Sequence, residues 1–379
     1  MVKKKLLFIV NADWFFLSHR LPIAIEAINQ EYEVHIATTI TNGLDVLKNN
    51  GLIVHPLNLH RSRSGVISIL SEFKEILGVI RLVAPNIVHL VTIKPVLLGG
   101  IASRLLNVPA VVYAVSGLGY TFLKKGFLAF FTRKIIIYLY RLAFRHKNKC
   151  VIFQNNNDQL TLSKLALLSS NEAELINGSG VDLSVFSQQP FNSGVPIVIL
   201  AARLLKDKGI KEFVDAAKLV NNNNNRARFV LVGEPDLHNP ASIQKHELDS
   251  WESEGIVELW GHKEDMNKVI SLSTIVVLPS YREGFPKILI EAAACGRPII
   301  TTDVPGCRDA IEKDVTGIIV SVRNPIELAR KISFLLDSPI LCREMGNAGR
   351  VRAEEIFDVN KVVEKHIKIY KELSNRILV

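Results

Sequence analysis

The sequence predicts an α/β protein made of two doubly wound domains, each built around a parallel sheet. Short apolar runs alternate with helical patterns along the chain, which is typical of βαβ units. The alternation stops in a polar segment at residues 188–195, QQPFNSGV, and then starts again. A length of 379 residues is enough for two domains of ordinary size. We therefore expect a first domain at 1–187, a second at 196–358 and a last helix at 359–379.

The expected elements follow from these runs in chain order. Apolar strands are expected at 5–10, 33–38, 53–58, 85–91, 108–115 and 151–154 in the first half, and at 197–201, 229–232, 257–259, 275–278, 298–301 and 317–320 in the second. Helical patterns separate them, and the helix after the first strand carries Leu21, Ile25 and Ile28 on one face. Further helices are expected at about 66–83, 96–106, 159–167 and 359–373.

The composition excludes several classes of protein. Hydrophobic residues make up 48% and charged residues 22%, which is typical of a soluble globular protein. Cys150, Cys295, Cys307 and Cys342 show neither metal spacing nor a disulfide framework, and they fit a reducing cytosolic setting. The first apolar run, Leu6–Val10, is too short for a signal peptide. We expect no transmembrane helix, because no long apolar window lacks charge.

The net charge of +9 is concentrated in one segment of the first half, Lys124–Lys149, which contains no acidic residue. On a continuous helix, Lys134, Tyr138, Arg141, Arg145 and Lys149 would form one stripe, with apolar residues on the other faces.

This pattern favours an interfacial helix on an anionic membrane, although a core helix with a solvated basic edge is the alternative. The residues expected to face the membrane are Lys124, Lys125, Arg133, Lys134, Arg141 and Arg145.

The most informative stretch is 278–300, LPSYREGFPKILIEAAACGRPII, which reads as strand, loop, helix and strand. Pro286 suits the first helical turn, and Gly296 suits the position after the last. Glu291 lies inside an apolar helix, where a carboxylate is costly to bury without a partner. A helix N-terminus favours a phosphate. We expect a nucleotide-sugar pocket in which Glu283 accepts from a sugar hydroxyl and Glu291 from a ribose hydroxyl.

The segment E-G-F-P-K-I-L-I-E, from Glu283 to Glu291, resembles the E-x7-E signature of the retaining glycosyltransferase family 4. The resemblance implies the GT-B fold, with two Rossmann-like domains facing a cleft and a C-terminal helix that crosses back to the first domain. The alternative is a surface Glu and a helix Glu with no shared role. Further donor-binding residues implied by the resemblance are Gly284, Phe285, Pro286, Lys287, Gly261 and His262.

Two cations follow the first strand of the second half. ARLLKDKGI resembles the family segment G-R-L-x-x-x-K-G, with Ala202 in place of the usual glycine. Arg203 and Lys208 are positioned to hold a diphosphate and to stabilise charge on it as it departs, unless each is only a surface charge.

Possible acceptor or cleft residues lie in the first domain. The loop after the first strand usually carries a Gly-Gly pair in the family, and here it carries Asp13 and three aromatic residues. His19 lies where the family often has a helix histidine, although a packing role is the alternative. Thr92 and Lys94 follow an expected strand at its carboxyl end, where ligands gather in parallel sheets.

The next expected strand ends at Ser116 and Gly117, where the family often has His-Gly. Because this position holds a serine, no catalytic histidine carries over. A dinucleotide-binding reading of Gly117-x-Gly119 is weak, since Phe122 stands in place of the third glycine.

The resemblance implies transfer of a sugar, an N-acetylhexosamine or hexose, from a UDP-sugar. Three segments of the first half are similar to segments of bacterial transferases that extend polyprenyl-diphosphate-linked surface polysaccharides such as O-antigen units. These segments are DWFFLSHRLPIA, HLVTIKP and SGLGYTF. We expect a cytoplasmic protein associated with the inner face of the plasma membrane, which needs no metal or other cofactor and binds no nucleic acid.

Three alternatives remain: a soluble transferase that uses a small acceptor, a nucleotide-sugar epimerase, and a non-catalytic nucleotide- or NAD-binding protein.

Overall fold

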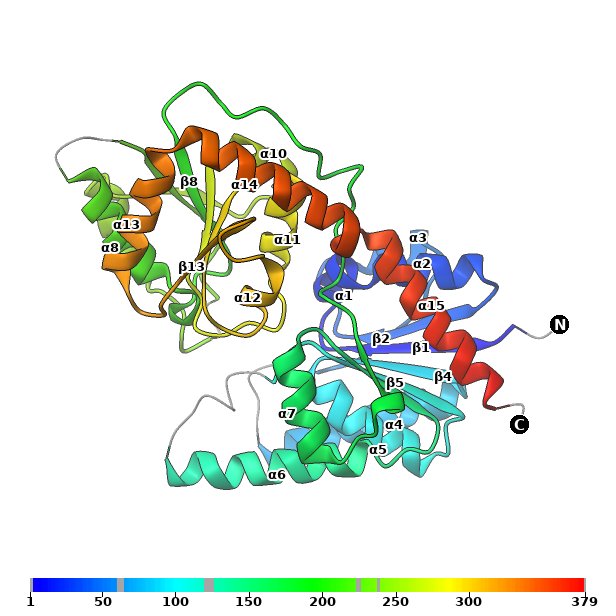
Figure 1. Cartoon of the computed structure of the whole chain (residues 1–379). Helices are drawn as coiled ribbons and strands as arrows, with labels where there is room; N and C mark the ends of the chain where they lie inside the picture. The colour runs from blue at the N-terminus through cyan, green and yellow to red at the C-terminus, as the bar shows by residue number, and fades with distance from the viewer. Residues whose placement is uncertain (1–2, 60–64, 119–125, 223–225, 237–238, 378–379) are drawn as a thin grey trace. The chain divides into compact units, whose positions relative to one another are not determined.

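The computed structural model describes residues 3–59, 65–118, 126–222, 226–236 and 239–377. The chain divides into two compact units (Figure 1). The first unit contains Met1–Ser179 together with Asn360–Val379, and the second contains Gly180–Val359. The chain therefore returns to the first unit with its last helix, as the family resemblance implies.

The first unit is built on a parallel sheet with the strand order β3-β2-β1-β4-β5-β6-β7. Its strands are β1 Lys5–Val10, β2 Glu33–Thr38, β3 Ile53–Pro56, β4 Ile87–Val91, β5 Ala110–Val115, β6 Lys149–Phe153 and β7 Ala173–Leu175. Its helices are α1 Asp13–His19, α2 Leu21–Asn29, α3 Leu44–Asn49, α4 Val66–Val83, η1 Pro95–Gly99, α5 Gly100–Leu105, α6 Phe127–Ala143, α7 Asn156–Ala166, η3 Ser170–Glu172 and α15 Val359–Asn375.

The central strands β4 and β5 of this sheet are buried along their whole length because helices cover both faces. One core joins alternate strand residues such as Leu7 and Ile9 to side chains of α4, α5, α6 and α7. On β1, the intervening Phe8 packs against Phe16 of α1 at 5.2 Å between ring centroids.

Helix α15 belongs to the first unit (Figure 1). Its Tyr370 side chain is fully buried, and the hydroxyl is hydrogen-bonded to His89 Nδ1 on β4 at 2.5 Å. Tyr370 also packs edge-on against Tyr32, which lies just before β2. These contacts fix the end of the chain to the sheet of the first unit.

The second unit contains a parallel sheet with the strand order β10-β9-β8-β11-β12-β13. Its strands are β8 Ile197–Ala201, β9 Arg228–Val232, β10 Glu258–Gly261, β11 Ile275–Leu278, β12 Ile299–Thr302 and β13 Gly317–Val320. Its helices are η4 Lys206–Lys208, α8 Ile210–Asn221, α9 Lys245–Ser253, α10 Met266–Leu272, α11 Lys287–Ala294, α12 Cys307–Ala310, α13 Pro325–Leu336, α14 Pro339–Arg352 and η5 Ala353–Phe357.

Residues of β8 alternate between two cores, which shows that this sheet is also covered on both faces. Val198 and Leu200 pack with α8 and α13 on one face. Ile197 and Ile199 pack with α10 and α11 on the other. The predicted fold class, two doubly wound α/β domains, is confirmed.

The second unit begins earlier than the predicted boundary at residue 187. The Val181 backbone N–H donates to the Phe357 carbonyl at 2.8 Å. Within the same segment, Arg350 Nη1 donates to the Phe186 carbonyl at 2.8 Å, and Arg297 Nη2 donates to the Pro190 carbonyl at 3.2 Å. Residues that we expected to end the first domain and form a linker are therefore tied to the second unit.

Candidate active site

The Glu283 loop joins β11 to α11 at the carboxyl edge of the second sheet. Thr302 Oγ1 donates to the Ser280 carbonyl at the start of the loop. Gly306 packs so closely on the loop that a Cβ atom there would lie 2.4 Å from the Gly284 carbonyl oxygen. Gly306 also has a φ of +80°, a backbone angle that favours glycine. The neighbouring segment after β12 therefore holds the loop in one conformation.

Glu283 and Lys208 form an ion pair within this loop region. Lys208 Nζ donates to Glu283 Oε1 at 2.5 Å, and Ser280 Oγ donates to the same oxygen at 2.7 Å. Both charged side chains are mostly buried, with 18% of Lys208 and 11% of Glu283 exposed. The structure thus brings together two residues that the sequence predicted for one site, and it adds Ser280, which the sequence analysis missed.

Gly209 explains how Lys208 reaches the Glu283 loop. Its φ is +74°, and a Cβ atom there would lie 2.3 Å from the Pro279 carbonyl oxygen. The Tyr281 backbone N–H also donates to the Asp207 carbonyl at 2.9 Å. The turn after β8 is therefore pressed directly against the end of β11.

Glu291 lies on α11, one turn after Lys287, and only 6% of the residue is exposed. Burial raises the pKa of its carboxyl group, and Lys287 Nζ, at 3.3 Å, acts in the opposite direction. We had expected Pro286 in the first turn of this helix, but Pro286 is the N-cap of α11. Phe285 packs against Phe357 at 5.7 Å between ring centroids, so a donor contact from Phe285 would have to come from its backbone.

Arg203 has a different partner from Lys208. Arg203 Nη1 donates to Asp236 Oδ2 at 3.0 Å, and about half of the Arg203 side chain is exposed. Asp236 follows β9, the strand next to β8, and the sequence analysis missed it. The two predicted cations are therefore each held by a carboxylate at the same edge of the sheet.

Gly261 and His262 end β10 at this same edge. Gly261 has a φ of +64°, and its carbonyl accepts from the Gly233 backbone N–H at 2.8 Å. His262 is exposed. Their proposed contact with a base stays a prediction.

Tyr281 joins a further group of residues that the sequence analysis missed. Its hydroxyl donates to Glu212 Oε1 at 2.6 Å, and the Arg323 guanidinium lies over its ring at 4.6 Å. Burial, together with Glu212, raises the pKa of Tyr281 to about 12. Tyr281 directly follows Ser280, so this group borders the Glu283 loop.

In the first unit, the Asp13 carboxylate is buried and fixes the loop that follows β2. It accepts hydrogen bonds from the Thr41 backbone and hydroxyl at 2.7 and 2.5 Å, and from the Gly43 backbone at 2.8 Å. Burial alone would raise its pKa, but these hydrogen bonds outweigh burial and lower it. A structural role therefore accounts for Asp13, and its predicted place in the acceptor site stays a prediction.

His19 and Lys94 are also held by contacts within the first unit. The His19 ring stacks on Phe15 at 4.1 Å between centroids, which agrees with the packing alternative. Lys94 Nζ forms an ion pair with the buried Glu72 at 2.8 Å.

Thr92, Ser116 and Gly117 lie at the carboxyl ends of β4 and β5. Thr92 has a φ of +73°, and Gly117 has a φ of +126°. Within the described part of the chain, Thr92 Oγ1 and Ser116 Oγ are buried without a hydrogen-bond partner, and so is Asn11 Oδ1 after β1. The sequence analysis missed Asn11, although its position directly after a strand was the available signal.

Helix α6 combines basic and exposed apolar residues. Its large exposed side chains are Phe130, Phe131, Ile135 and Tyr138. Lys134 Nζ lies 4.6 Å from the centroid of the Phe130 ring. On α6, Arg141 is exposed and Arg133 is partly exposed, and the exposed Arg145 follows the end of the helix at Ala143. Lys124 and Lys125 lie outside the described residues.

The expectation that Lys149 continues the basic stripe was wrong. Helix α6 ends at Ala143, and Lys149 begins β6, where it is buried and forms an ion pair with Glu172. None of the helices in the described residues is long and apolar enough to span a membrane.

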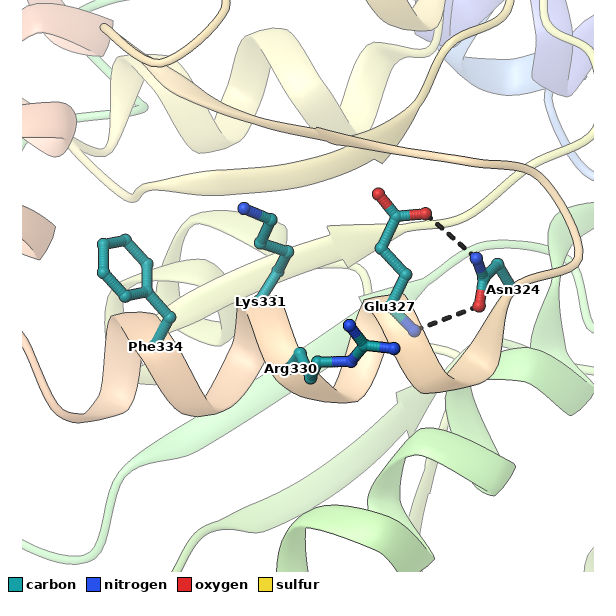
Figure 2. Close-up of a pocket in the computed structure, with 5 residues that line it drawn as sticks. All are labelled: Asn324, Glu327, Arg330, Lys331 and Phe334. Atoms are coloured by element: carbon teal, nitrogen blue, oxygen red, sulfur yellow. Dashed lines mark hydrogen bonds between the residues drawn. The ribbon is translucent and has the colours of Figure 1, made fainter.

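A cavity of about 370 Å³ lies along α13 (Figure 2). It is lined by Asn324, Glu327, Arg330, Lys331 and Phe334. Figure 2 shows Asn324 and Glu327 exchanging two hydrogen bonds at the start of the helix. None of the residues predicted for the site lines this cavity.

Comparison with known proteins defines the class of the chain. Residues 5–155 match the family described as "Glycosyl transferase 4-like", and residues 184–352 match "Glycosyl transferases group 1". The matches fall on the two structural units, so the class is a two-domain glycosyltransferase with the GT-B fold. The chain is therefore a glycosyltransferase whose first domain is of the family 4-like type and whose second domain is of the group 1 type, as the resemblance indicated.

The names of two relatives specify acceptors that are linked to diphospho-undecaprenol. The chain is 28% identical to the N,N'-diacetylbacillosaminyl-diphospho-undecaprenol alpha-1,3-N-acetylgalactosaminyltransferase of Campylobacter jejuni, over 96% of the chain and 99% of that protein. It is 24% identical to the UDP-Gal:alpha-D-GlcNAc-diphosphoundecaprenol alpha-1,3-galactosyltransferase of Escherichia coli, over 81% of each.

Solved structures share the fold at low sequence identity. The chain resembles Anabaena HepE in complex with UDP with a TM-score of 0.79 and 17% identity, over 97% of the chain and 100% of HepE. It resembles a sucrose-phosphate synthase from Thermosynechococcus elongatus with a TM-score of 0.81 and 17% identity, over 98% of the chain and 99% of that structure.

Proposed function

We propose that this glycosyltransferase moves a sugar from a UDP-sugar to a glycan carried on a polyprenyl diphosphate, with retention of the anomeric configuration. The observation that carries the proposal is the Glu283–Lys208 pair at the carboxyl edge of the second sheet. The names of the two relatives support the class of acceptor. The transferred sugar is an N-acetylhexosamine or a hexose, and the cleft that the sequence predicts between the domains is part of the proposal.

Lys208 and Arg203 bind the diphosphate of the donor. Departure of the sugar increases the negative charge on the diphosphate, and a preorganised cation stabilises that charge. Lys208 is mostly buried, where solvent screens its charge less than at the surface. Arg203 is more exposed and contributes a bidentate guanidinium. Glu283 holds hydroxyls of the transferred sugar, because its carboxylate can accept from several donors at once.

The N-terminus of α11 provides the second half of the donor site. Its first backbone N–H groups lie beside the Glu283 loop, and helix N-termini favour phosphate oxygens. Gly284 and Pro286 shape this turn, and Glu291 accepts from a ribose hydroxyl. Burial strengthens a hydrogen bond from such a group to the Glu291 carboxylate, which the Lys287 side chain also contacts.

Helix α6 places the enzyme on an anionic membrane at the inner face of the plasma membrane. Exposed aromatic and aliphatic side chains on a basic helix are typical of interfacial binding.

We predict that Lys134→Glu combined with Arg145→Glu lowers binding to phosphatidylglycerol vesicles by roughly tenfold or more, since each basic residue contributes about 1 kcal/mol. Lys365→Glu combined with Lys368→Glu, at two exposed lysines of α15, is the charge-matched control, and vesicle sedimentation is the measurement. Equal binding by the double variant and the control would remove this part of the proposal.

The experiment is transfer from a panel of UDP-sugars to extracted polyprenyl-diphosphate glycans. We expect label in the lipid fraction with the wild type, a collapse in Glu283→Ala and Arg203→Ala, and wild-type rates in Glu344→Ala and Arg343→Ala, two exposed charges on α14. EDTA should not change the rate, because we propose that no metal takes part. Transfer to soluble acceptors alone would favour the soluble-transferase alternative, and absence of UDP-sugar binding would refute the donor site.

A further inference from the structure

Three polar side chains follow neighbouring strands of the first sheet. Asn11 follows β1, Thr92 follows β4 and Ser116 follows β5. These strands are adjacent and parallel. Continuing the register in which Ile9 pairs with Leu90 places Asn11 opposite Thr92. All three residues therefore lie at one edge of the sheet, at the carboxyl ends of its central strands, where parallel sheets bind ligands.

Each of the three side chains carries a buried oxygen that lacks a partner. Asn11 Oδ1, Thr92 Oγ1 and Ser116 Oγ make no hydrogen bond within the residues that the structure describes. Burying such an atom without a partner is unfavourable, so folded proteins rarely leave several together. By contrast, the nearby Asp13 carboxylate accepts hydrogen bonds from the Trp14 backbone and from the loop that follows β2. The three unpaired oxygens indicate that a ligand supplies the missing partners.

The backbone of Thr92 is strained. Its φ of +73° is an outlier for a β-branched residue, and a conformation of this kind is energetically unfavourable. The Thr92 carbonyl accepts from the Val96 backbone N–H at 3.0 Å, and the π-helical turn Pro95–Gly99 follows. Glycine would adopt the same backbone without this cost. The presence of threonine at this position therefore indicates that the Thr92 side chain has a functional role.

The chemistry of this edge matches uncharged hydroxyl groups. A serine or threonine hydroxyl and an asparagine amide can each donate and accept hydrogen bonds, as sugar hydroxyls do. The charged neighbours Asp13 and Lys94 are held within the unit by the Thr41 loop and by Glu72. The edge is therefore suited to a sugar ring and less suited to a diphosphate.

We propose that Asn11, Thr92 and Ser116 form a subsite for the hydroxyl groups of a sugar, in which Thr92 determines which hydroxyl pattern fits. The proposal rests on the function proposed above and names the group that this edge recognises. The sugar is either the one transferred from the donor or the terminal sugar of the acceptor. Both sugars present hydroxyl groups, so the subsite chemistry is the same for each. The two cases differ in whether a variant changes KM for the donor or for the acceptor.

The first experiment compares Thr92→Val and Ser116→Ala with Ser103→Ala. Ser103 Oγ is likewise buried without a partner among the described residues, but it lies on α5. We expect KM for one substrate to rise about fivefold to tenfold in the two edge variants, because each loses a hydrogen bond to a hydroxyl. A rise for the UDP-sugar assigns the subsite to the donor, and a rise for the lipid-linked glycan assigns it to the acceptor. Unchanged KM values for both substrates would overturn the proposal.

Thr92→Gly separates binding from structure. Glycine relieves the strained backbone, so we expect a melting temperature equal to or above that of the wild type, together with the raised KM. A purely structural threonine would instead show a lower melting temperature and an unchanged KM, which would refute the role of Thr92.

Saturation-transfer NMR with methyl glycosides of N-acetylglucosamine, N-acetylgalactosamine, glucose and galactose tests the subsite without turnover. Signals that weaken in Thr92→Val but not in Ser103→Ala support the subsite even if transfer to the lipid fails. Equal signals in all variants would overturn it, whatever the outcome of the transfer assay.

Discussion

At the scale of single residues, the buried Glu291 carboxylate of α11 makes the stability of the fold depend on pH. Its carboxylate is buried in an apolar helix, and burial raises its pKa above the ordinary value of 4.5. The folded chain therefore binds a proton on Glu291 more tightly than the unfolded chain does. Consequently, the free energy of unfolding falls as pH rises from 4.5 through the raised pKa. Above that window the folded protein carries a buried carboxylate, which the Lys287 ammonium at 3.3 Å partly offsets.

We predict that Glu291→Gln does not lower the melting temperature at neutral pH, because glutamine is uncharged and has nearly the same shape. The same variant should raise KM for the UDP-sugar about tenfold or more, since a hydrogen bond to a charged acceptor is lost. Thermal denaturation and donor kinetics check the two statements. A less stable variant with unchanged donor KM would show that Glu291 is structural.

That Lys208 and Glu283 belong to one site could be predicted, because they follow β8 and β11, which end at the same edge of a parallel sheet, but their ion pair was not predicted. The contacts of Ser280 and Asp236 could not be predicted, because they depend on side-chain directions and hydrogen bonds rather than on sequence spacing. Gly209 is similar. A glycine after Lys208 predicts a turn, but only the structure shows the Pro279 carbonyl that excludes any side chain.

At the scale of elements, α15 is attached to the first sheet through buried histidines. The His89 ring stacks with His366 of α15 at 5.7 Å, and its Nδ1 is hydrogen-bonded to the Tyr370 hydroxyl. Burial lowers the pKa of both imidazoles, with the nearby Arg20 guanidinium acting in the same direction, and the pKa of His366 falls to about 3. Both histidines are therefore neutral in the folded protein.

This cluster predicts sensitivity to acid. A histidine with a lowered pKa stabilises the fold fully above its unfolded pKa of 6.5, and that contribution is lost as pH falls. The loss amounts to about 1.4 kcal/mol per pH unit for each histidine. We expect His366→Gln to reduce the fall in unfolding free energy between pH 6.5 and about 5, measured by denaturant titration. The exposed His262→Gln should leave the fall unchanged, and an unchanged fall in His366→Gln would contradict this account.

Element boundaries show where sequence reasoning fails. Strand bounds at Lys5–Val10, Glu33–Thr38 and Ile197–Ala201 agree with the apolar runs that predicted them. Helix α6 was extended too far because basic residues recur at helical spacing beyond Ala143, although the chain there turns into β6. Periodicity does not reveal that Lys149 meets Glu172 in a buried pair.

At the scale of the whole molecule, the two units have separate sheets and separate cores. Chains of this kind often unfold in more than one step. We predict that UDP at 100 times its Kd stabilises the transition of the second unit by about 2.7 kcal/mol.

Scanning calorimetry measures the effect of UDP, and Phe213→Ala in the second core identifies the transition by lowering it. A shift confined to the transition of the first unit would contradict the assignment of the donor site to the second unit.

The most direct test of the donor site is to compare Lys208→Ala with Lys206→Ala in the transfer assay. Both lysines lie in the turn η4, but Lys206 is exposed and Lys208 is paired with Glu283. We predict that Lys208→Ala lowers kcat/KM about 10²–10³-fold, as loss of a preorganised group at the departing charge does. Lys206→Ala should retain the wild-type value. Equal values for the two variants would show that Lys208 does not act on the diphosphate and would contradict the account.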